Sequence, residues 1–134
     1  MRNTLVCLSL SFVTLCMLSC HKTEGQKPEE LAGRTAKAYY DYLIEGKYEA
    51  YTDGFYQPDS IPDSYREQLI VNAKQYAAQM KEDHGGLAAV KVAGAKADTA
   101  RHTGHAFLVL CFKDSTKEEI VVPMALVEGN WMMK

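Results

Sequence analysis

The chain has 134 residues, of which 47% are hydrophobic, a composition typical of one globular domain and not of a disordered segment. Its 15 basic and 17 acidic residues give a net charge of −2, and both signs are scattered along the sequence. No basic patch therefore indicates a nucleic-acid partner. No phosphate-binding glycine loop, nucleophile elbow or zinc-ligand spacing occurs, so neither a cofactor nor a metal is expected.

Residues 1–19 have the pattern of an export signal. Arg2 supplies a positive charge, residues 5–18 are mostly apolar, and the small residue Ser19 precedes Cys20. The apolar run would form roughly 21 Å of helix, which is shorter than the roughly 30 Å hydrocarbon core of a bilayer. A cleaved signal is therefore favoured over a retained transmembrane helix.

Residues 17–20, Met-Leu-Ser-Cys, resemble the lipobox of bacterial lipoprotein signals. The resemblance implies that Cys20 is lipidated and becomes the first residue of a protein anchored to a membrane of the bacterial cell envelope, on its periplasmic or surface side. The alternative is an ordinary secretory signal in which Cys20 is incidental. In the first case, residues 20–27 are the lipidated cysteine followed by a polar, flexible tether.

Removal of the signal would leave Cys111 as the one free thiol, because Cys7 and Cys16 depart and Cys20 bears lipid. An internal disulfide could not form, so the hydrophobic core alone must stabilise the mature chain. Cys111 lies in the apolar stretch 107–112 and is interpreted as a buried packing residue, not as a nucleophile.

The first part of the domain, from residue 28, predicts three helices. Residues 28–45 follow a helical apolar period between Pro28 and the stop at Gly46. A short helix is expected at 47–52 and a long one at 62–83, with Gly85 and Gly86 beyond its end. Ser64 and Glu67 have capping-box spacing, although Asp63 could cap instead. One stripe of the long helix is expected to face the core: Tyr65, Leu69, Ala73, Tyr76 and Met80.

The rest of the chain predicts strands at 88–98, 103–113, 118–127 and 130–134. Helices followed by strands indicate an α+β fold, and the short turns between strands favour an antiparallel meander. The two middle strands are apolar on both faces, so the second face needs a partner or must curl on itself, and a homodimer is expected. Pro123 predicts a bulge or an edge position, and Trp131 is expected to fill the core.

The order of these elements over residues 28–134 resembles the nuclear transport factor 2-like superfamily, an α+β cone also called cystatin-like. More narrowly, residues 46–51 (Gly-Lys-Tyr-Glu-Ala-Tyr) and 127–133 (Val-Glu-Gly-Asn-Trp-Met-Met) are similar to the uncharacterised lumazine-binding-like lipoprotein family, which is common in gut Bacteroidetes. The resemblance implies one domain of N-terminal helices packed on a curved antiparallel sheet, with a cavity between the first helix and the concave face.

Five side chains could face such a cavity: Tyr39, Tyr42, Tyr51, Tyr56 and His105. Enzymes that resemble this superfamily, such as ketosteroid isomerase and scytalone dehydratase, transfer protons with inward Asp, Tyr or His. General acid–base catalysis needs a base near its proton and a group that holds developing charge, and no such catalytic pair can be named here. His102 lies three residues before His105, on the opposite face of a strand, so the two do not predict a metal site.

Two functions remain open from the sequence. The favoured one is a non-enzymatic lipoprotein whose cone binds a small molecule or another envelope protein. The alternative is a small lyase or isomerase that uses His105 with a nearby Tyr or Asp.

Overall fold

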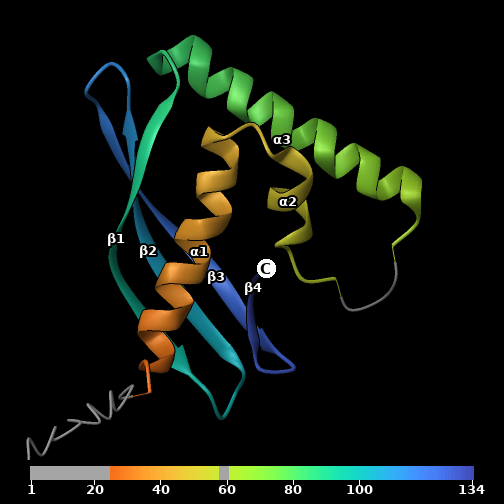
Figure 1. The fold of residues 1–134 in the computed structure, drawn as a ribbon, viewed down its shortest axis with the longest axis vertical. Coiled ribbons are helices and arrows are strands. Elements are labelled where there is room, and N and C mark those ends of the chain that lie inside the picture. Colours follow the sequence, from red (N-terminus) through yellow and green to blue (C-terminus); the bar gives the residue numbers. More distant parts are fainter. Residues whose placement is uncertain (1–24, 58–60) are drawn as a thin grey trace, which may run out of the picture.

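The structure, a computed structural model, describes residues 25–57 and 61–134. The predicted signal, Cys20 and the first part of the tether lie outside these residues. The described chain forms three helices followed by four strands (Figure 1). They are α1 (Pro28–Ile44), α2 (Tyr48–Asp53), α3 (Asp63–His84), β1 (Leu87–Asp98), β2 (Thr103–Phe112), β3 (Lys117–Val127) and β4 (Asn130–Met133).

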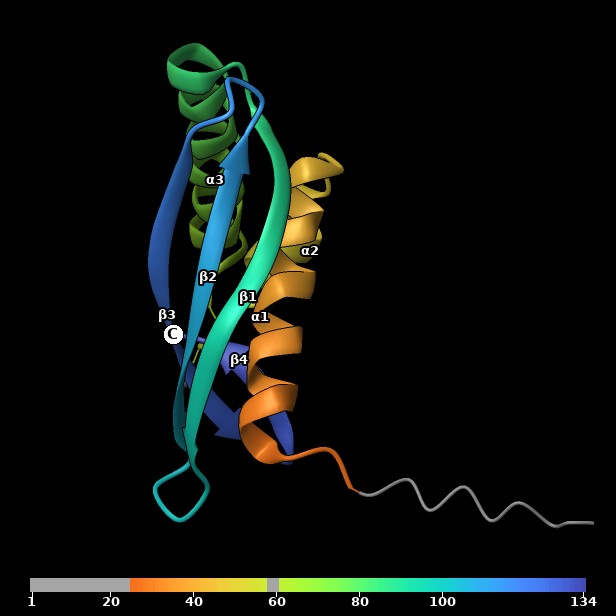
Figure 2. The same cartoon turned by 90° about the vertical axis from the view of Figure 1, so that its left-hand side faces the viewer.

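The strands form one antiparallel sheet in the order β1-β2-β3-β4, which confirms the predicted meander. Along β2 every second residue from Gly104 to Phe112 is buried, and the residues between them are half-buried or exposed. The buried set packs with residues of all three helices, and the helices lie to one side of the curved sheet (Figure 2). The sheet therefore has a helix-facing side and an outward side, as an α+β cone requires.

Helix α1 packs closely on the sheet because its inward face is made of small residues. Ala32 and Ala36 are fully buried. An added Cβ at Gly33 would come within 3.0 Å of Val92 Cγ1 and 3.3 Å of Ala95 Cβ, both on β1. This contact leaves no room for a larger side chain.

The sheet curls at defined positions. Strand β1 has register shifts between Leu87 and Ala89 and between Val92 and Gly94, and such bulges bend a strand and increase its twist. On β3, the Pro123 carbonyl accepts a hydrogen bond from the Lys134 N–H at 3.0 Å. A residue of an antiparallel strand directs its N–H and C=O to the same neighbour. The N–H that proline lacks would therefore point toward Lys134, at the place where the pairing of β3 with β4 ends.

The predicted ends of the helices are confirmed at their C-termini and corrected at the start of α3. Gly46 (φ +71°) and Gly85 (φ +77°) follow α1 and α3 in the left-handed conformation that glycine adopts without strain. The N-cap position of α3 is Pro62, and no side chain caps the helix. The predictions of Ser64 or Asp63 as the cap are wrong, because the helix begins at Asp63 and places both inside its first turn.

Three residues that were expected in the core differ in how far they are buried. Trp131 is 3% exposed, which confirms that it fills the core, but Tyr65 is 48% exposed, because the first turns of α3 extend past the sheet. Cys111 is half-buried, not buried, because it shares the outward side of β2, where the described helices do not pack. None of the helices in residues 25–57 and 61–134 is long and apolar enough to cross a membrane.

Candidate functional site

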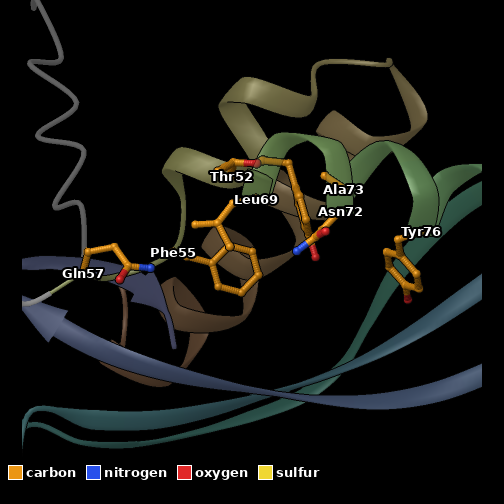
Figure 3. A pocket seen from close by; sticks show the side chains of 8 residues that line it. Thr52, Phe55, Gln57, Leu69, Asn72, Ala73 and Tyr76 are labelled. Carbon is orange, nitrogen blue, oxygen red and sulfur yellow. The ribbon is translucent and has the colours of Figure 1, made fainter. Parts of the chain in front are cut away.

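A cavity of about 260 Å³ lies between α2 and α3 on the helix-facing side of the sheet (Figure 3). Its walls come from α2, from the segment that follows α2, and from α3. The described residues that line it are Tyr51, Thr52, Phe55, Gln57, Leu69, Asn72, Ala73 and Tyr76. Mainly apolar walls with a few polar groups are typical of sites for small molecules.

The segment after α2 is held in place by backbone pairing with β4. Tyr56 N–H donates to the Met133 carbonyl at 2.6 Å, and Met133 N–H donates to the Gly54 carbonyl at 2.8 Å. Gly54 is required at this turn because an added Cβ would lie 2.4 Å from the ring of Tyr39 on α1. Phe55 is thereby fixed between these two attachments and forms one wall of the cavity.

Tyr51 joins an aromatic cluster with Tyr40 and Phe55 beside the cavity. Tyr51 makes edge-to-face contacts with Tyr40, at 5.6 Å between ring centroids, and with Phe55, at 5.3 Å. Burial raises the pKa of Tyr51 and of Tyr40. Burial also raises the pKa of Tyr76 to about 12, with contributions from Tyr40 and Glu118. All three phenols are therefore protonated near pH 7 and can donate hydrogen bonds.

Besides the phenols of Tyr51 and Tyr76, the polar side chains of the cavity wall are Thr52, Gln57 and Asn72. Thr52 is 5% exposed, and its Oγ1 has no hydrogen-bond partner. Asn72 Oδ1 accepts a hydrogen bond from Gln68 at 3.0 Å, which leaves the Asn72 amide NH₂ as a donor. A buried hydroxyl without a partner costs about 1–3 kcal/mol. The Oγ1 is covered by the side chains around it, so a ligand that hydrogen-bonds to Thr52 would recover this energy on a small movement of those side chains.

Polar contacts fix α3 at both ends of the cavity region. Arg66 on α3 forms a bidentate ion pair with Asp53 on α2: its Nε donates to Oδ1 at 3.0 Å and its Nη2 donates to Oδ2 at 2.9 Å. At the other end of α3, His84 Nδ1 lies 2.9 Å from Asp114 Oδ2 in the β2–β3 turn. The His84 ring also stacks on Phe112, with centroids 4.3 Å apart. These contacts hold α3 over the sheet at positions where few apolar side chains of the helix pack on the rest of the fold.

The structure separates the five cavity residues expected from the sequence. Tyr51 lines the cavity, whereas Tyr39 and Tyr42 line a shallow depression on the outer side of α1. Tyr56 lies in a depression near the β3–β4 turn. His105 is exposed on the outward side of β2, beside Lys96 and across the sheet from the cavity.

Sequence reasoning missed Thr52, Asn72 and Gln57. A signal for Asn72 was present, because it lies within the helical stripe of Leu69, Ala73 and Tyr76, where an amide among apolar residues indicates a hydrogen-bonding need. Of the described residues that line the cavity, none is a carboxylate, an imidazole, an amine or a thiol. Within the described parts of the chain, His, Cys, Asp and Glu do not gather in groups of three that could hold a metal ion.

Comparisons with known proteins indicate the fold. No protein-family model and no curated protein matches the sequence. A solved structure of a Campylobacter jejuni protein, described as an NTF2-like transpeptidase, is similar over 75% of this chain and 94% of that one, with a TM-score of 0.60 and 12% identity. Likeness at this identity shows the fold alone. The chain has the nuclear transport factor 2-like cone fold, as its resemblance implied.

Proposed function

We propose that this protein is a lipid-anchored envelope protein whose cone binds a small, mainly apolar molecule in the cavity between α2 and α3. The observation on which the proposal rests is the cavity of about 260 Å³ with the unpartnered Thr52 hydroxyl in its wall. The ligand would be a compact, flat or branched apolar molecule with one polar group, because aromatic rings form much of the wall and hydrogen-bonding groups are few.

The anchoring part of the proposal is supported by residues 1–20 of the sequence, where an apolar run ends at Ser19 and Cys20. Lipid at Cys20 would keep the cone close to a membrane surface, and more than one acyl chain would make the attachment stable. Metabolic labelling with radioactive palmitate tests this directly. The chain should incorporate label, and the Cys20→Ala variant should not. Equal labelling of both chains would contradict the proposed anchor.

Binding in the cavity can be tested with the fluorescent probe N-phenyl-1-naphthylamine. Ala73 is 4% exposed in the cavity wall, so Ala73→Leu fills the space that a ligand would occupy. We expect this variant to bind the probe at least about tenfold more weakly, which is about 1.4 kcal/mol, because the leucine side chain occupies part of the cavity volume. The matched control is Ala78→Leu, an exposed position of the same helix. Equal affinity of the wild type and Ala73→Leu would refute this site.

A competition experiment tests whether the polar group of the ligand hydrogen-bonds to Thr52. If Thr52 provides the hydrogen bond, 2-naphthol should displace the probe at lower concentration than naphthalene does. The Thr52→Val variant keeps the shape of the side chain and removes its hydroxyl, so it should lose this preference and still bind naphthalene. A preference that persists in Thr52→Val would assign the hydrogen bond to another group.

A further inference from the structure

A carboxylate stands on the helix-facing side of the sheet without belonging to the cavity wall: Glu118, near the start of β3. Glu118 pairs with Leu110 on β2, and residues directly opposite each other in paired strands project from the same side of a sheet. Leu110 is fully buried in the core that the helices cover. The side chain of Glu118 therefore projects from the helix-facing side, and it is exposed to solvent there.

Tyr76 on α3 links this carboxylate to the cavity. His84 at the end of α3 contacts Asp114 in the turn that precedes β3, which places the C-terminal part of the helix beside the start of that strand. Tyr76 lies two turns earlier, in the cavity wall, and its ring is directed toward the strands (Figure 3).

The phenols of Tyr76 and Tyr40 respond to the same carboxylate. Burial is the main cause of the raised pKa of both tyrosines, and the negative charge of Glu118 adds to it in each case. The effect of one charge on another group falls with distance, so Glu118 lies close to the aromatic side of the cavity.

The charge of Glu118 has no positive partner in the described parts of the chain. None of the ion pairs found within residues 25–57 and 61–134 includes Glu118. Its neighbours on β3, Lys117 and Glu119, pair with Cys111 and Val109, which belong to the outward side of β2. The helix-facing side of β3 therefore has negative potential beside Tyr76.

The aromatic rings of the cavity favour the same sign of ligand charge. The face of an aromatic ring is electronegative and attracts ammonium groups. Tyr51, Phe55 and Tyr76 all contribute rings to the wall, and none of the described lining residues carries a positive charge. A cationic ligand would thus be attracted both by the rings and by Glu118, whereas Glu118 would repel an anionic one.

We propose that the ligand of this cavity is an amphiphilic amine, whose apolar body lies in the cavity and whose ammonium group lies between the ring of Tyr76 and the carboxylate of Glu118. This inference names the class of ligand for the proposed binding site and rests on that proposal. The ammonium group is additional to the polar group that meets Thr52, because Thr52 and Tyr76 are separated along the cavity (Figure 3). At the exposed Glu118 the ammonium keeps part of its hydration, so the pair avoids the full desolvation cost of a buried ion pair.

Displacement of the neutral probe N-phenyl-1-naphthylamine from the full chain tests the charge of the ligand. The competitors are 2-(1-naphthyl)ethylamine, 2-(1-naphthyl)ethanol and 1-naphthaleneacetate, which are cationic, neutral and anionic at about pH 7. We expect the amine to displace the probe at about tenfold lower concentration than the alcohol, and the anion to be the weakest competitor.

The two proposals fail in different ways in this experiment. Equal displacement by the amine and the alcohol would overturn the amine as ligand and leave the cavity as a binding site. Absence of probe binding would overturn both. The advantage of the amine should also fall as NaCl rises from about 0.02 M to about 0.5 M, because salt screens an exposed charge pair. An advantage that does not change with salt would contradict the role of a carboxylate.

Removal of two neighbouring carboxylates tests the assignment to Glu118. Glu118→Gln should remove most of the advantage of the amine over the alcohol. The matched control Glu119→Gln removes the carboxylate on the outward side of the same strand and should leave that advantage intact. The two competitors are compared on the same variant, so a general loss of affinity is not counted as a loss of charge recognition. An unchanged advantage in Glu118→Gln, or an equal loss in both variants, would overturn the assignment.

Discussion

Helices α1 and α3 lie over the same side of the sheet but differ in how closely they pack against it. The inward face of α1 consists of Ala32, Gly33 and Ala36 along its first half, and the helix comes into direct contact with β1. Helix α3 is longer, with 22 residues against 17, yet it buries only Ile70, Ala73 and Met80. Helix length therefore does not determine how much of a helix joins the core.

The difference follows from the size and polarity of the side chains. Small residues let the backbone of α1 approach the sheet, and the large core side chains of the sheet then surround the helix. On α3, Leu69, Asn72 and Tyr76 project toward the region where the sheet curves away, and they line the cavity without filling it. Close packing gives the cone its stability, and the looser contact leaves space for a ligand.

The sharpest test of the close contact is the substitution Gly33→Leu. The side chain would enter a space where a Cβ alone already approaches Val92 at 3.0 Å. We expect a loss of about 3 kcal/mol in the free energy of unfolding, since overpacking outweighs the better helix propensity of leucine. Urea denaturation measures it. The neighbouring Arg34→Leu introduces the same residue at an exposed position and should change stability by less than about 0.5 kcal/mol. Similar values for the two variants would show that α1 is not closely packed.

The opposite result is expected at the loosely packed region, where Thr52→Val should stabilise the protein. The substitution removes a buried hydroxyl that has no partner and keeps the volume of the side chain. We expect a gain of about 1 kcal/mol in the free energy of unfolding without ligand. Thr35→Val, at a half-buried position of α1, is the matched control and should give no comparable gain. A destabilised Thr52→Val would mean that the hydroxyl has a partner in the folded protein.

The sequence predicted the fold well because its signals are local. Gly46 and Gly85 mark helix ends, and the change from a helical to an alternating period marks the start of the sheet. The cavity could be predicted only in outline. Whether a helical tyrosine such as Tyr39 or Tyr51 faces the cavity depends on how α1 and α2 are placed relative to α3. That placement is set by long-range contacts, such as the Arg66–Asp53 pair, which no periodicity encodes.

The smallest effect concerns the link that fixes the C-terminal end of α3 to the sheet. Hydrogen bonds from Thr116 and from His84 lower the pKa of Asp114 from 3.8 to about 2. In the unfolded chain Asp114 has its ordinary pKa, so the folded state is favoured by the ionised carboxylate. This stabilisation is complete above about pH 4 and is lost as the pH falls toward about 2.

Asp114→Asn removes the charge and should therefore lower stability near pH 6 by a modest amount that disappears near pH 2. Denaturation midpoints of wild type and variant, measured across this range, should converge as the pH falls. The control Asp83→Asn changes the carboxylate next to His84 in the last turn of α3, which contacts only Gln79 of its own helix among the hydrogen bonds described, and its difference from wild type should not follow this course. Parallel curves for wild type and Asp114→Asn would show that the contacts of the Asp114 carboxylate with Thr116 and His84 do not stabilise the folded protein, and the Arg66–Asp53 pair would then be the main polar link that positions α3 beside the cavity.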